Sequence, residues 1–107
     1  MRSSTTVTVR HATPSSRIRS ILATGLDPSF ATGKLKVCWL HQPRKSKWAR
    51  THVSHRHNTP EQQVALLEMR LPLADLRRRS DGVWTCDRII RPDEFTSING
   101  LKLYNPA

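Results

Sequence analysis

A strand that leads directly into a helix is predicted near the start of the chain, and it limits the folds that the chain can adopt. Val7, Val9 and His11 alternate with polar residues, which is the pattern of a strand with one buried face. One of two adjacent serines after this strand can cap a helix whose apolar residues lie on one side and which ends at Gly25. We therefore expect His11 on the apolar face, at a strand end that borders a ligand-binding cleft.

The rest of the chain predicts one α+β domain with a mostly antiparallel sheet. Within the second predicted strand, Leu35, Val37 and Trp39 fall on one apolar face. The arginine run at 77–79 resembles a nucleic-acid patch, but such a run is more often an exposed charged turn, and a turn is expected here. The predicted strands cover residues 7–11, 35–40, 63–71, 83–86 and 88–90, with an edge strand within 97–104, and the predicted helices cover 15–25 and 44–57, with helical turns at 73–76 and 92–95.

Composition limits the number of domains and the class of partner. The chain has 107 residues, of which 36% are hydrophobic, and suits a single domain over 1–107 with a core at about 7–98 and a tail at 99–107. Lys and Arg number 18 against 8 Asp and Glu, so the formal net charge is +10. A positive field of this size predicts phosphate-rich partners, nucleic acid above all.

Targeting signals and cysteines indicate the compartment. No apolar run approaches the roughly 20 residues that a membrane span needs, and residues 1–6 lack the apolar core of a signal peptide. We therefore expect a cytoplasmic protein without a membrane partner. Cys38 and Cys86 lie in apolar strand-like runs and are expected to be free thiols that pack as small hydrophobic side chains.

Four segments, in order along the chain, resemble motifs of one enzyme family. They are residues 9–13 (Val-Arg-His-Ala-Thr), 18–26, 37–41 (Val-Cys-Trp-Leu-His), and 81–85 (Asp-Gly-Val-Trp-Thr) together with 90–95. They resemble the NAD-binding lobe of RNA 2′-phosphotransferases and, more broadly, the ADP-ribosyltransferase fold shared with diphtheria-type toxins and poly-ADP-ribose polymerases. The resemblance implies a small split sheet with flanking helices, and NAD⁺ as a substrate.

The resemblance also implies roles for the residues at its motif positions. His11 corresponds to the histidine of a His-Gly-Thr motif, whose side chain and following backbone, here Ala12 and Thr13, hold the ribose and carboxamide of NAD⁺. Trp39 takes the position that packs on the nicotinamide, where the phosphotransferases have histidine. Val83 takes the position that is glutamate in most protein-modifying members, which disfavours modification of proteins. The phosphotransferases bind RNA through a separate N-terminal lobe, which is not expected in this chain.

A basic segment after Trp39 is a candidate surface for nucleic acid. Its cations can neutralise phosphates, and an exposed tryptophan can stack on a base. Residues 54–58 (Ser-His-Arg-His-Asn) resemble a Gly-Arg-Arg-His-Gly run of the phosphotransferases, which implies contact between Arg56 and phosphate. The alternative is a solvated helix face with Trp48 in the core. The predicted nucleic-acid-binding residues are Arg44, Lys45, Lys47, Trp48, Arg50 and Arg56.

Several of these candidates also have purely structural explanations. His11 can be a hydrogen-bonded histidine at a strand end, and Trp39 can pack in the core, where Trp84 is expected as well. The three histidines within residues 52–57 have no cysteine or carboxylate at the spacing of zinc ligands, so no metal site is predicted.

The main functional prediction is NAD-dependent ADP-ribosyl transfer to a nucleic-acid or phosphate-bearing acceptor, related to RNA 2′-phosphotransferase chemistry. In this interpretation His11 orients the NAD⁺ ribose and Trp39 packs on the nicotinamide. Arg56, with Arg10 or Arg50, neutralises the charge of the acceptor or the pyrophosphate. Two alternatives stay open: a non-catalytic basic module that binds RNA or single-stranded DNA and has a degenerate NAD pocket, and a toxin-like ADP-ribosyltransferase neutralised by a partner protein.

Overall fold

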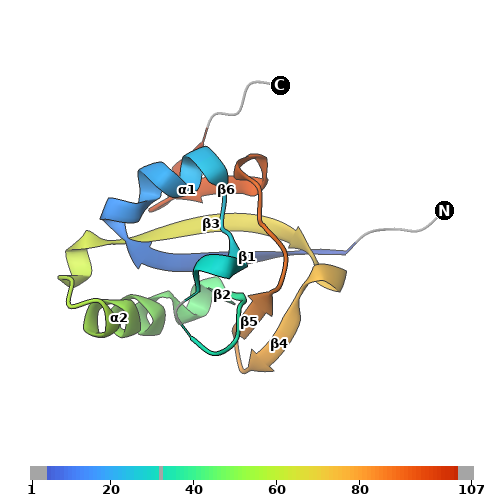
Figure 1. The fold of residues 1–107 in the computed structure, drawn as a ribbon, viewed down its shortest axis with the longest axis horizontal. Coiled ribbons are helices and arrows are strands. Elements are labelled where there is room, and N and C mark those ends of the chain that lie inside the picture. The colour runs from blue at the N-terminus through green and yellow to red at the C-terminus, as the bar shows by residue number, and fades with distance from the viewer. Residues whose placement is uncertain (1–4, 32, 104–107) are drawn as a thin grey trace.

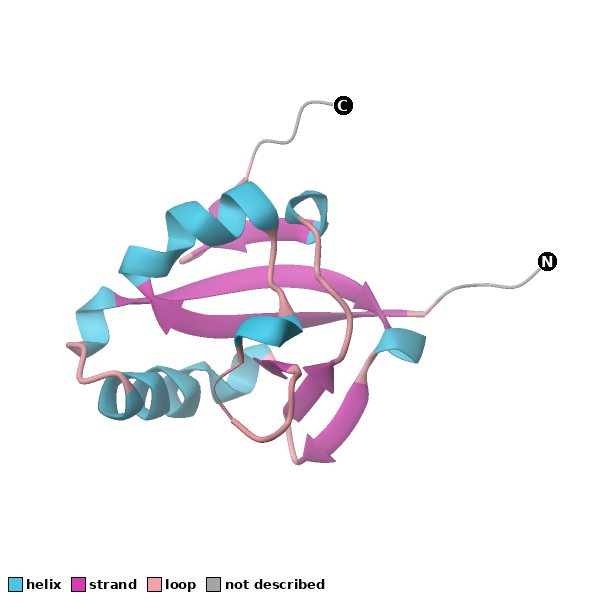
Figure 2. Ribbon diagram, viewed as in Figure 1, coloured by secondary structure: helices cyan, strands magenta, loops and turns pink. Residues whose placement is uncertain are grey.

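A seven-stranded antiparallel sheet forms the centre of the protein (Figure 1, Figure 2). The computed structural model describes residues 5–31 and 33–103, and within them the strands follow the order β4-β5-β2-β1-β3-β6-β7. The α+β class and the antiparallel sheet are confirmed. The elements are β1 (Thr6–Pro14), α1 (Ile18–Thr24), β2 (Cys38–His41), α2 (Ser46–Arg56), β3 (Val64–Pro72), β4 (Arg77–Ser80), β5 (Val83–Cys86), β6 (Phe95–Ile98) and β7 (Leu101–Lys102).

The long pair β1 and β3 forms the backbone of the sheet. The two strands are in register over their full length, from Thr6 opposite Pro72 to Pro14 opposite Val64. Val9 lies opposite Met69, and both side chains are fully buried. Ile21 of α1 shares the core with Val9, whereas Ser46 of α2 accepts a hydrogen bond from Arg10. Neighbouring residues of a strand point to opposite faces, so α1 and α2 (Figure 1) cover opposite faces of the central strands.

The hydrophobic core lies on the α1 side of the sheet. It joins side chains of five strands to α1 and to the two segments that cross this face, at Leu26 and Ile90. These two residues form an isolated antiparallel bridge. Gly25, which ends α1, has φ +88°, and a side chain at this position would collide with the carbonyl of Ile90. The two thiols, Cys38 and Cys86, are free and belong to this core, as expected.

The sheet is split between β1 and β2. These strands share a single register pair, Arg10 opposite His41, although β1 continues along β3 as far as Pro14. The split divides the sheet into a long half, β1-β3-β6-β7, and a short half, β2-β5-β4. Residues 11–14 of β1 therefore have a strand neighbour on the β3 side and none on the β2 side, within the part of the chain that the structure describes.

Trp39 does not lie on the buried face, and the prediction of its face is wrong. Its side chain is 46% exposed, whereas its neighbours Cys38 and Leu40 are buried. Residues 33–37 contain bends instead of a strand, so the alternation of side chains begins at Cys38, and Leu35 is exposed as well. The predicted core position of Trp84 is confirmed, because this side chain packs against the core cluster.

Two further segments differ from their predictions. Residues 88–90 form no strand: Arg88 turns away to bind Asp75 and Glu94, and only Ile90 bridges to Leu26. Residues 77–79 belong to a strand, β4, because their backbone pairs with β5. Of the predicted tail at 99–107, residues 101–102 form β7, and residues 104–107 lie outside the described residues, including Tyr104 at the end of the predicted edge strand. The described part contains no helix that is long and apolar enough to cross a bilayer.

Candidate functional site

The first candidate residue, His11, lies at the split. Its side chain is half-buried, and its Nδ1 lies 2.8 Å from the carbonyl oxygen of Trp39 on β2. A carbonyl oxygen only accepts hydrogen bonds, so Nδ1 donates and carries the proton. Burial is the main cause that lowers the pKa of His11, although the bond to Trp39 opposes it, and the charge of Arg17 lowers it further. The neutral ring therefore presents Nε2 as a free acceptor among the described residues.

A second histidine, His41, lies beside the split and is also uncharged. It is 3% exposed, and burial, followed by the nearby His11 and Arg10, lowers its pKa to about 4. Its Nε2 lies 3.4 Å from Oγ of Ser46, the first residue of α2. Ser46 in turn accepts a 3.0 Å hydrogen bond from Nη1 of Arg10.

Arg10 is held in place by a carboxylate. Its Nε donates to Oε1 of Glu68 at 2.9 Å, directly across the β1–β3 pair. The side chains of Arg10 and Glu68 are 30% and 26% exposed, so this ion pair is partly shielded from water. Arg10 therefore links β1, β3 and α2, and its charge is already compensated. This arrangement leaves Arg10 less able to bind an acceptor phosphate than the sequence analysis expected.

The split brings His11 and Trp39 together without making their rings face each other. Arg10 and His41 are register partners and lie on one face of the sheet. Trp39 is two residues from His41 and lies on that same face, which α2 borders through Ser46. His11 leaves β1 on the opposite face and reaches the Trp39 peptide through the gap. The imidazole and the indole thus border the same gap from its two sides.

The other predicted cofactor residues lie along the same boundary. Ala12 and Thr13 follow His11 on β1, where they pair with β3 and have no partner on β2. Thr13 is buried, and Ala12 is half-buried. Val83 lies opposite His41 in the β2–β5 pair, one strand away from the gap. The backbone of residues 12–13 is therefore the part of this set that lies on the open edge of β1.

Among the predicted nucleic-acid residues on and before α2, Arg44 and Lys45 lie beside a carboxylate. Arg44 donates to both carboxylate oxygens of Asp81, with a 2.5 Å contact from Nη2, and Lys45 lies 3.9 Å from the same carboxylate. Trp48 is 50% exposed and stacks on His52 with ring centroids 5.5 Å apart. Lys47 and Arg56 are exposed as well, and Arg50 is half-buried.

Arg50 and Arg56 lie further along α2 than Trp48. Arg50 has a buried Nε without a hydrogen-bond partner. Arg56 ends α2, about 15 Å along the helix from Ser46. The exposure of Trp48 contradicts the alternative that it is a core anchor.

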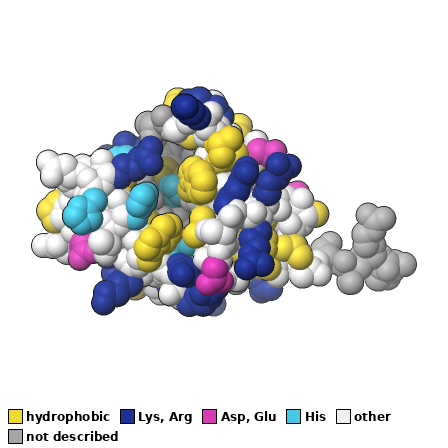
Figure 3. Space-filling view, turned by 90° about the horizontal axis from the view of Figure 1, so that it is seen from below, with side chains coloured by type: hydrophobic (Ala, Val, Ile, Leu, Met, Phe, Trp, Pro, Cys, Tyr) yellow, Lys and Arg dark blue, Asp and Glu magenta, His cyan; other side chains and the backbone are white. Residues whose placement is uncertain are grey.

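A group that the sequence analysis did not assign to the site is the arginine run of β4. Arg77, Arg78 and Arg79 are all exposed on the outermost strand of the short half. The run was visible in the sequence, but its strand structure was not, because β4 has no apolar residue. One face of the protein gathers Lys and Arg side chains beside hydrophobic side chains and histidines (Figure 3).

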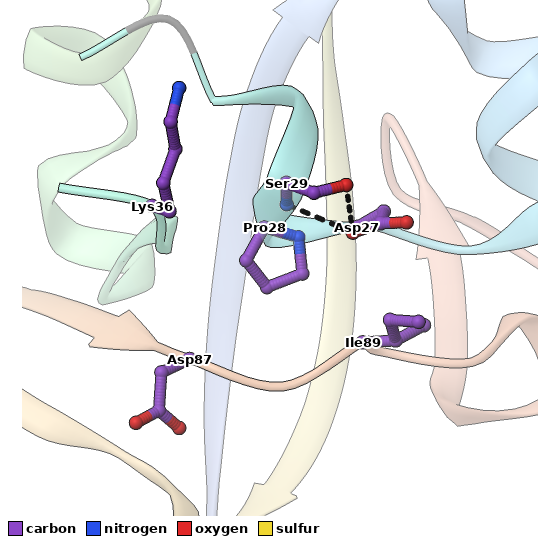
Figure 4. A pocket seen from close by; sticks show the side chains of 6 residues that line it. All are labelled: Asp27, Pro28, Ser29, Lys36, Asp87 and Ile89. Atoms are coloured by element: carbon purple, nitrogen blue, oxygen red, sulfur yellow. Dashed lines mark hydrogen bonds between the residues drawn. The ribbon is translucent and has the colours of Figure 1, made fainter. Parts of the chain in front are cut away.

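Two cavities of the described structure have linings that include neither His11 nor Trp39. One has a volume of about 380 Å³ and is shown in Figure 4. There Asp27 is turned toward Ser29, which donates two hydrogen bonds to it and lowers its pKa. Lys36 and Asp87 point to opposite sides, so the charged groups do not converge on a ligand. The second cavity, of about 400 Å³, is lined by Ser54, His55, Asn58, Thr59 and Pro60.

The arrangement at the split suits recognition of a neutral, hydroxyl-bearing group. It offers an uncharged imidazole acceptor, a backbone edge without a strand partner on the β2 side and a half-exposed indole, while its arginine is compensated. Among the described residues, no three His, Cys, Asp or Glu side chains gather as metal ligands. Comparison of the chain with protein-family models, with curated protein sequences and with solved structures found no match.

Proposed function

We propose that the protein binds NAD⁺ at the split between β1 and β2 and transfers its ADP-ribosyl group to a nucleic-acid or phosphate-bearing acceptor. The observation that carries this proposal is the state of His11. Its Nδ1 is tied to the Trp39 carbonyl, so Nε2 of the neutral ring is available to accept a hydrogen bond from a ribose hydroxyl. The resemblance of the motif around His11 to the NAD-binding lobe of RNA 2′-phosphotransferases also supports NAD⁺ binding at this position.

In this proposal different residues along the gap bind different parts of NAD⁺. The unpaired edge of β1 at Ala12 and Thr13 offers backbone groups to the nicotinamide carboxamide. The indole of Trp39 packs on the nicotinamide ring, to which its half-exposed face is open. Arg56, with Arg50, neutralises the pyrophosphate. Arg10 has a structural role, because its hydrogen bonds to Glu68 and Ser46 connect the elements around the gap.

The chemical step needs little proton transfer. The bond between ribose C1′ and the nicotinamide nitrogen breaks, and nicotinamide leaves as a neutral molecule with the bonding electron pair. A lone pair on an acceptor oxygen then forms the new bond to C1′, and the acceptor proton passes to water. Val83 supplies no carboxylate here, so catalysis rests on orientation of NAD⁺ and acceptor rather than on a general base.

The test is calorimetric titration with NAD⁺, followed by an assay of nicotinamide release with RNA, single-stranded DNA and protein as acceptors. The wild type should bind NAD⁺ and release nicotinamide with a nucleic acid. His11→Asn keeps a donor for the Trp39 carbonyl but removes Nε2, so it should weaken NAD⁺ binding at least about tenfold. His52→Ala, which removes an exposed histidine on α2, should bind normally. Absence of both binding and release in the wild type would overturn the proposal.

A second candidate, a non-catalytic module that binds nucleic acid, is favoured by two observations. The motif position that is glutamate in protein-modifying transferases is Val83, while the net charge of the chain is +10. In this case nucleic-acid binding would weaken steeply with salt and would be the same in the wild type and in His11→Ala. The two candidates therefore separate on NAD⁺ binding alone.

A further inference from the structure

We infer that a single-stranded nucleic acid binds across the short half of the sheet, with two of its phosphates on Arg77 and Arg79. The inference rests on the proposed function for the identity of this strand as the acceptor and for the preference for a single strand over a duplex. The binding surface itself follows from the register of β2, β5 and β4. We call the three residues Trp39, Thr85 and Arg77, together with Arg79, the β4–β2 row.

The register places the β4–β2 row on one face of the sheet. Trp39 lies opposite Thr85 in the β2–β5 pair, and Thr85 lies opposite Arg77 in the β4–β5 pair. Partners in antiparallel strands share a face, and neighbouring strands are about 4.8 Å apart, so Arg77 lies about 10 Å from Trp39 at the level of the backbone. A phosphate held by Arg77 is therefore within one or two nucleotides of the proposed nicotinamide position.

A second arginine of β4, Arg79, has its side chain on the same face. The register shifts between Arg78 and Ser80, so Arg79 is an extra residue in the strand. Its Nε donates a 2.9 Å hydrogen bond to Oγ1 of Thr85, which fixes the side chain on the Thr85 face beside Arg77. In a regular strand, residues two apart are separated by about 6.8 Å, which is similar to the distance between successive phosphates of a nucleic-acid backbone.

The charges of this surface are available to a ligand. Arg77, Arg78 and Arg79 form no ion pair with any residue of the described part. The acidic side chain nearest in sequence, Asp81, binds Arg44 instead. Three neighbouring guanidinium groups repel one another, so a bound phosphate backbone would relieve this repulsion as well as release counterions.

A single strand suits this surface better than a duplex. The acceptor group must enter the gap beside Trp39, and a group in a duplex first has to leave the stack, which costs energy. Arginine on an edge strand also prevents sheets from pairing edge to edge. Prevention of edge-to-edge pairing needs only charged side chains anywhere along β4. Phosphate binding, in contrast, needs the side chains of Arg77 and Arg79 on the same face as Thr85.

Fluorescence anisotropy with a labelled single-stranded RNA of about 12 nucleotides tests the inference. Arg77→Ala/Arg79→Ala should weaken binding about 25-fold near 0.1 M salt and lower the slope of log Kd against log salt by about 1.4, the effect of two lost phosphate contacts on a single strand. Arg78→Ala removes one charge from the same strand on the other face and should change Kd no more than about twofold, since salt screens its charge. Arg77→Lys/Arg79→Lys keeps both charges and should retain most of the affinity.

Several results would overturn the inference. They are unchanged RNA binding in Arg77→Ala/Arg79→Ala, an equal loss in Arg78→Ala, tighter binding of duplex than of single-stranded DNA or RNA, and no binding of single strands by the wild type. Circular dichroism of the double variant shows whether it is folded. If it is not, the lysine variant and the glutamine variant Arg77→Gln/Arg79→Gln take its place, and equal RNA affinity in these two would overturn the inference.

Titration of the same variants with NAD⁺ separates this inference from the proposed function. Arg77→Ala/Arg79→Ala should bind NAD⁺ as the wild type does. A wild type that binds RNA through these arginines but does not bind NAD⁺ would disprove the proposed function and leave the β4–β2 row as an RNA site. If the wild type binds NAD⁺ and the double variant loses no RNA affinity, the inference about Arg77 and Arg79 would be disproved and the proposed NAD⁺ site would stand.

Discussion

The split and the β4 edge hold their basic side chains in opposite states. At the split, Arg10 is compensated by Glu68, and burial keeps the imidazole of His41 uncharged. At the edge, Arg77 and Arg79 carry their charge without a carboxylate partner in the described part of the chain. A neutral imidazole suits the hydroxyl groups of a sugar, and an unpaired guanidinium suits phosphate. In the proposed function the two regions therefore bind different ligands, the ribose of NAD⁺ at the split and the phosphates of a nucleic acid at the β4 edge.

The difference teaches that partners, and not residue type, determine what a basic side chain can do. Arg88 is the extreme case, because it binds the carboxylates of Asp75 and Glu94 and serves to hold two turns together. The arginines of β4 have the same side chain and no such partner. Four predictions test this comparison.

The largest expected effect is on the pH dependence of stability, and it tests whether the histidines of the split are uncharged. The pKa of His41 is about 4 in the folded protein, below its ordinary value of 6.5, so the unfolded chain binds more protons between these values. The free energy of unfolding should fall as the pH is lowered from about 6.5 to about 4, by about 3 kcal/mol from this residue, with no further loss from it below that range. Urea unfolding at a series of pH values measures this.

His41→Gln should remove most of this slope. Burial also lowers the pKa of His11, so a smaller slope of the same sign should remain in that variant. If the wild type and His41→Gln lost stability equally on acidification, the imidazole of His41 would not be the group that the fold keeps neutral, and the contrast between the split and the β4 edge would fail.

The second effect concerns the turn that joins the two regions. Gly82 connects β4 to β5 with φ +74°, and a Cβ there would lie 2.7 Å from Cγ of Lys45. Gly82→Ala should lower the free energy of unfolding by about 2 kcal/mol, from the left-handed backbone and from the displaced lysine. Gly100→Ala has φ +81° and open space around it, so it should cost about 1 kcal/mol. Equal losses in the two variants would mean that the Lys45 contact does not matter.

The third effect is the loss of the carboxylate at the split. Glu68→Gln leaves Arg10 half-buried without its compensating charge and should lower the free energy of unfolding by about 1 to 2 kcal/mol. Asp93→Asn is the control, because its partner Arg91 is 70% exposed, and it should have a smaller effect. Chemical denaturation of both variants measures the difference. A larger loss in Asp93→Asn would show that Arg10 does not depend on Glu68.

The sequence predicts those elements whose side chains alternate or repeat locally. The apolar residues around Val9 and Met69 indicate β1 and β3, and the position of Gly25 indicates the end of α1, because these patterns depend on neighbours along the chain. Strand β4 contains three arginines and a serine, and its structure comes from pairing with β5. No local pattern contains that information.

The candidate site, too, is predicted only where it depends on local sequence. The sequence indicates His11 as a candidate, but its bond to the Trp39 carbonyl depends on the divergence of β1 from β2, which tertiary packing sets. Arg44 and Asp81 are 37 residues apart and meet only through the fold. The sequence therefore presents Arg44 and Arg77 as equally basic, and the structure separates them.

The smallest expected effect tests this separation directly. The charge of Arg44 is offset by Asp81, so Arg44→Ala should weaken single-stranded RNA binding by less than about threefold, against about 25-fold for Arg77→Ala/Arg79→Ala. Asp81→Asn provides the reciprocal variant: it frees Arg44 and Lys45 from their carboxylate and should strengthen RNA binding about fivefold by adding one phosphate contact. Anisotropy at one salt concentration measures all three. If Arg44→Ala weakened binding as much as the double variant, ion pairing would not decide which arginines bind phosphate, and the basic segment before α2 would be as much a part of the nucleic-acid surface as β4.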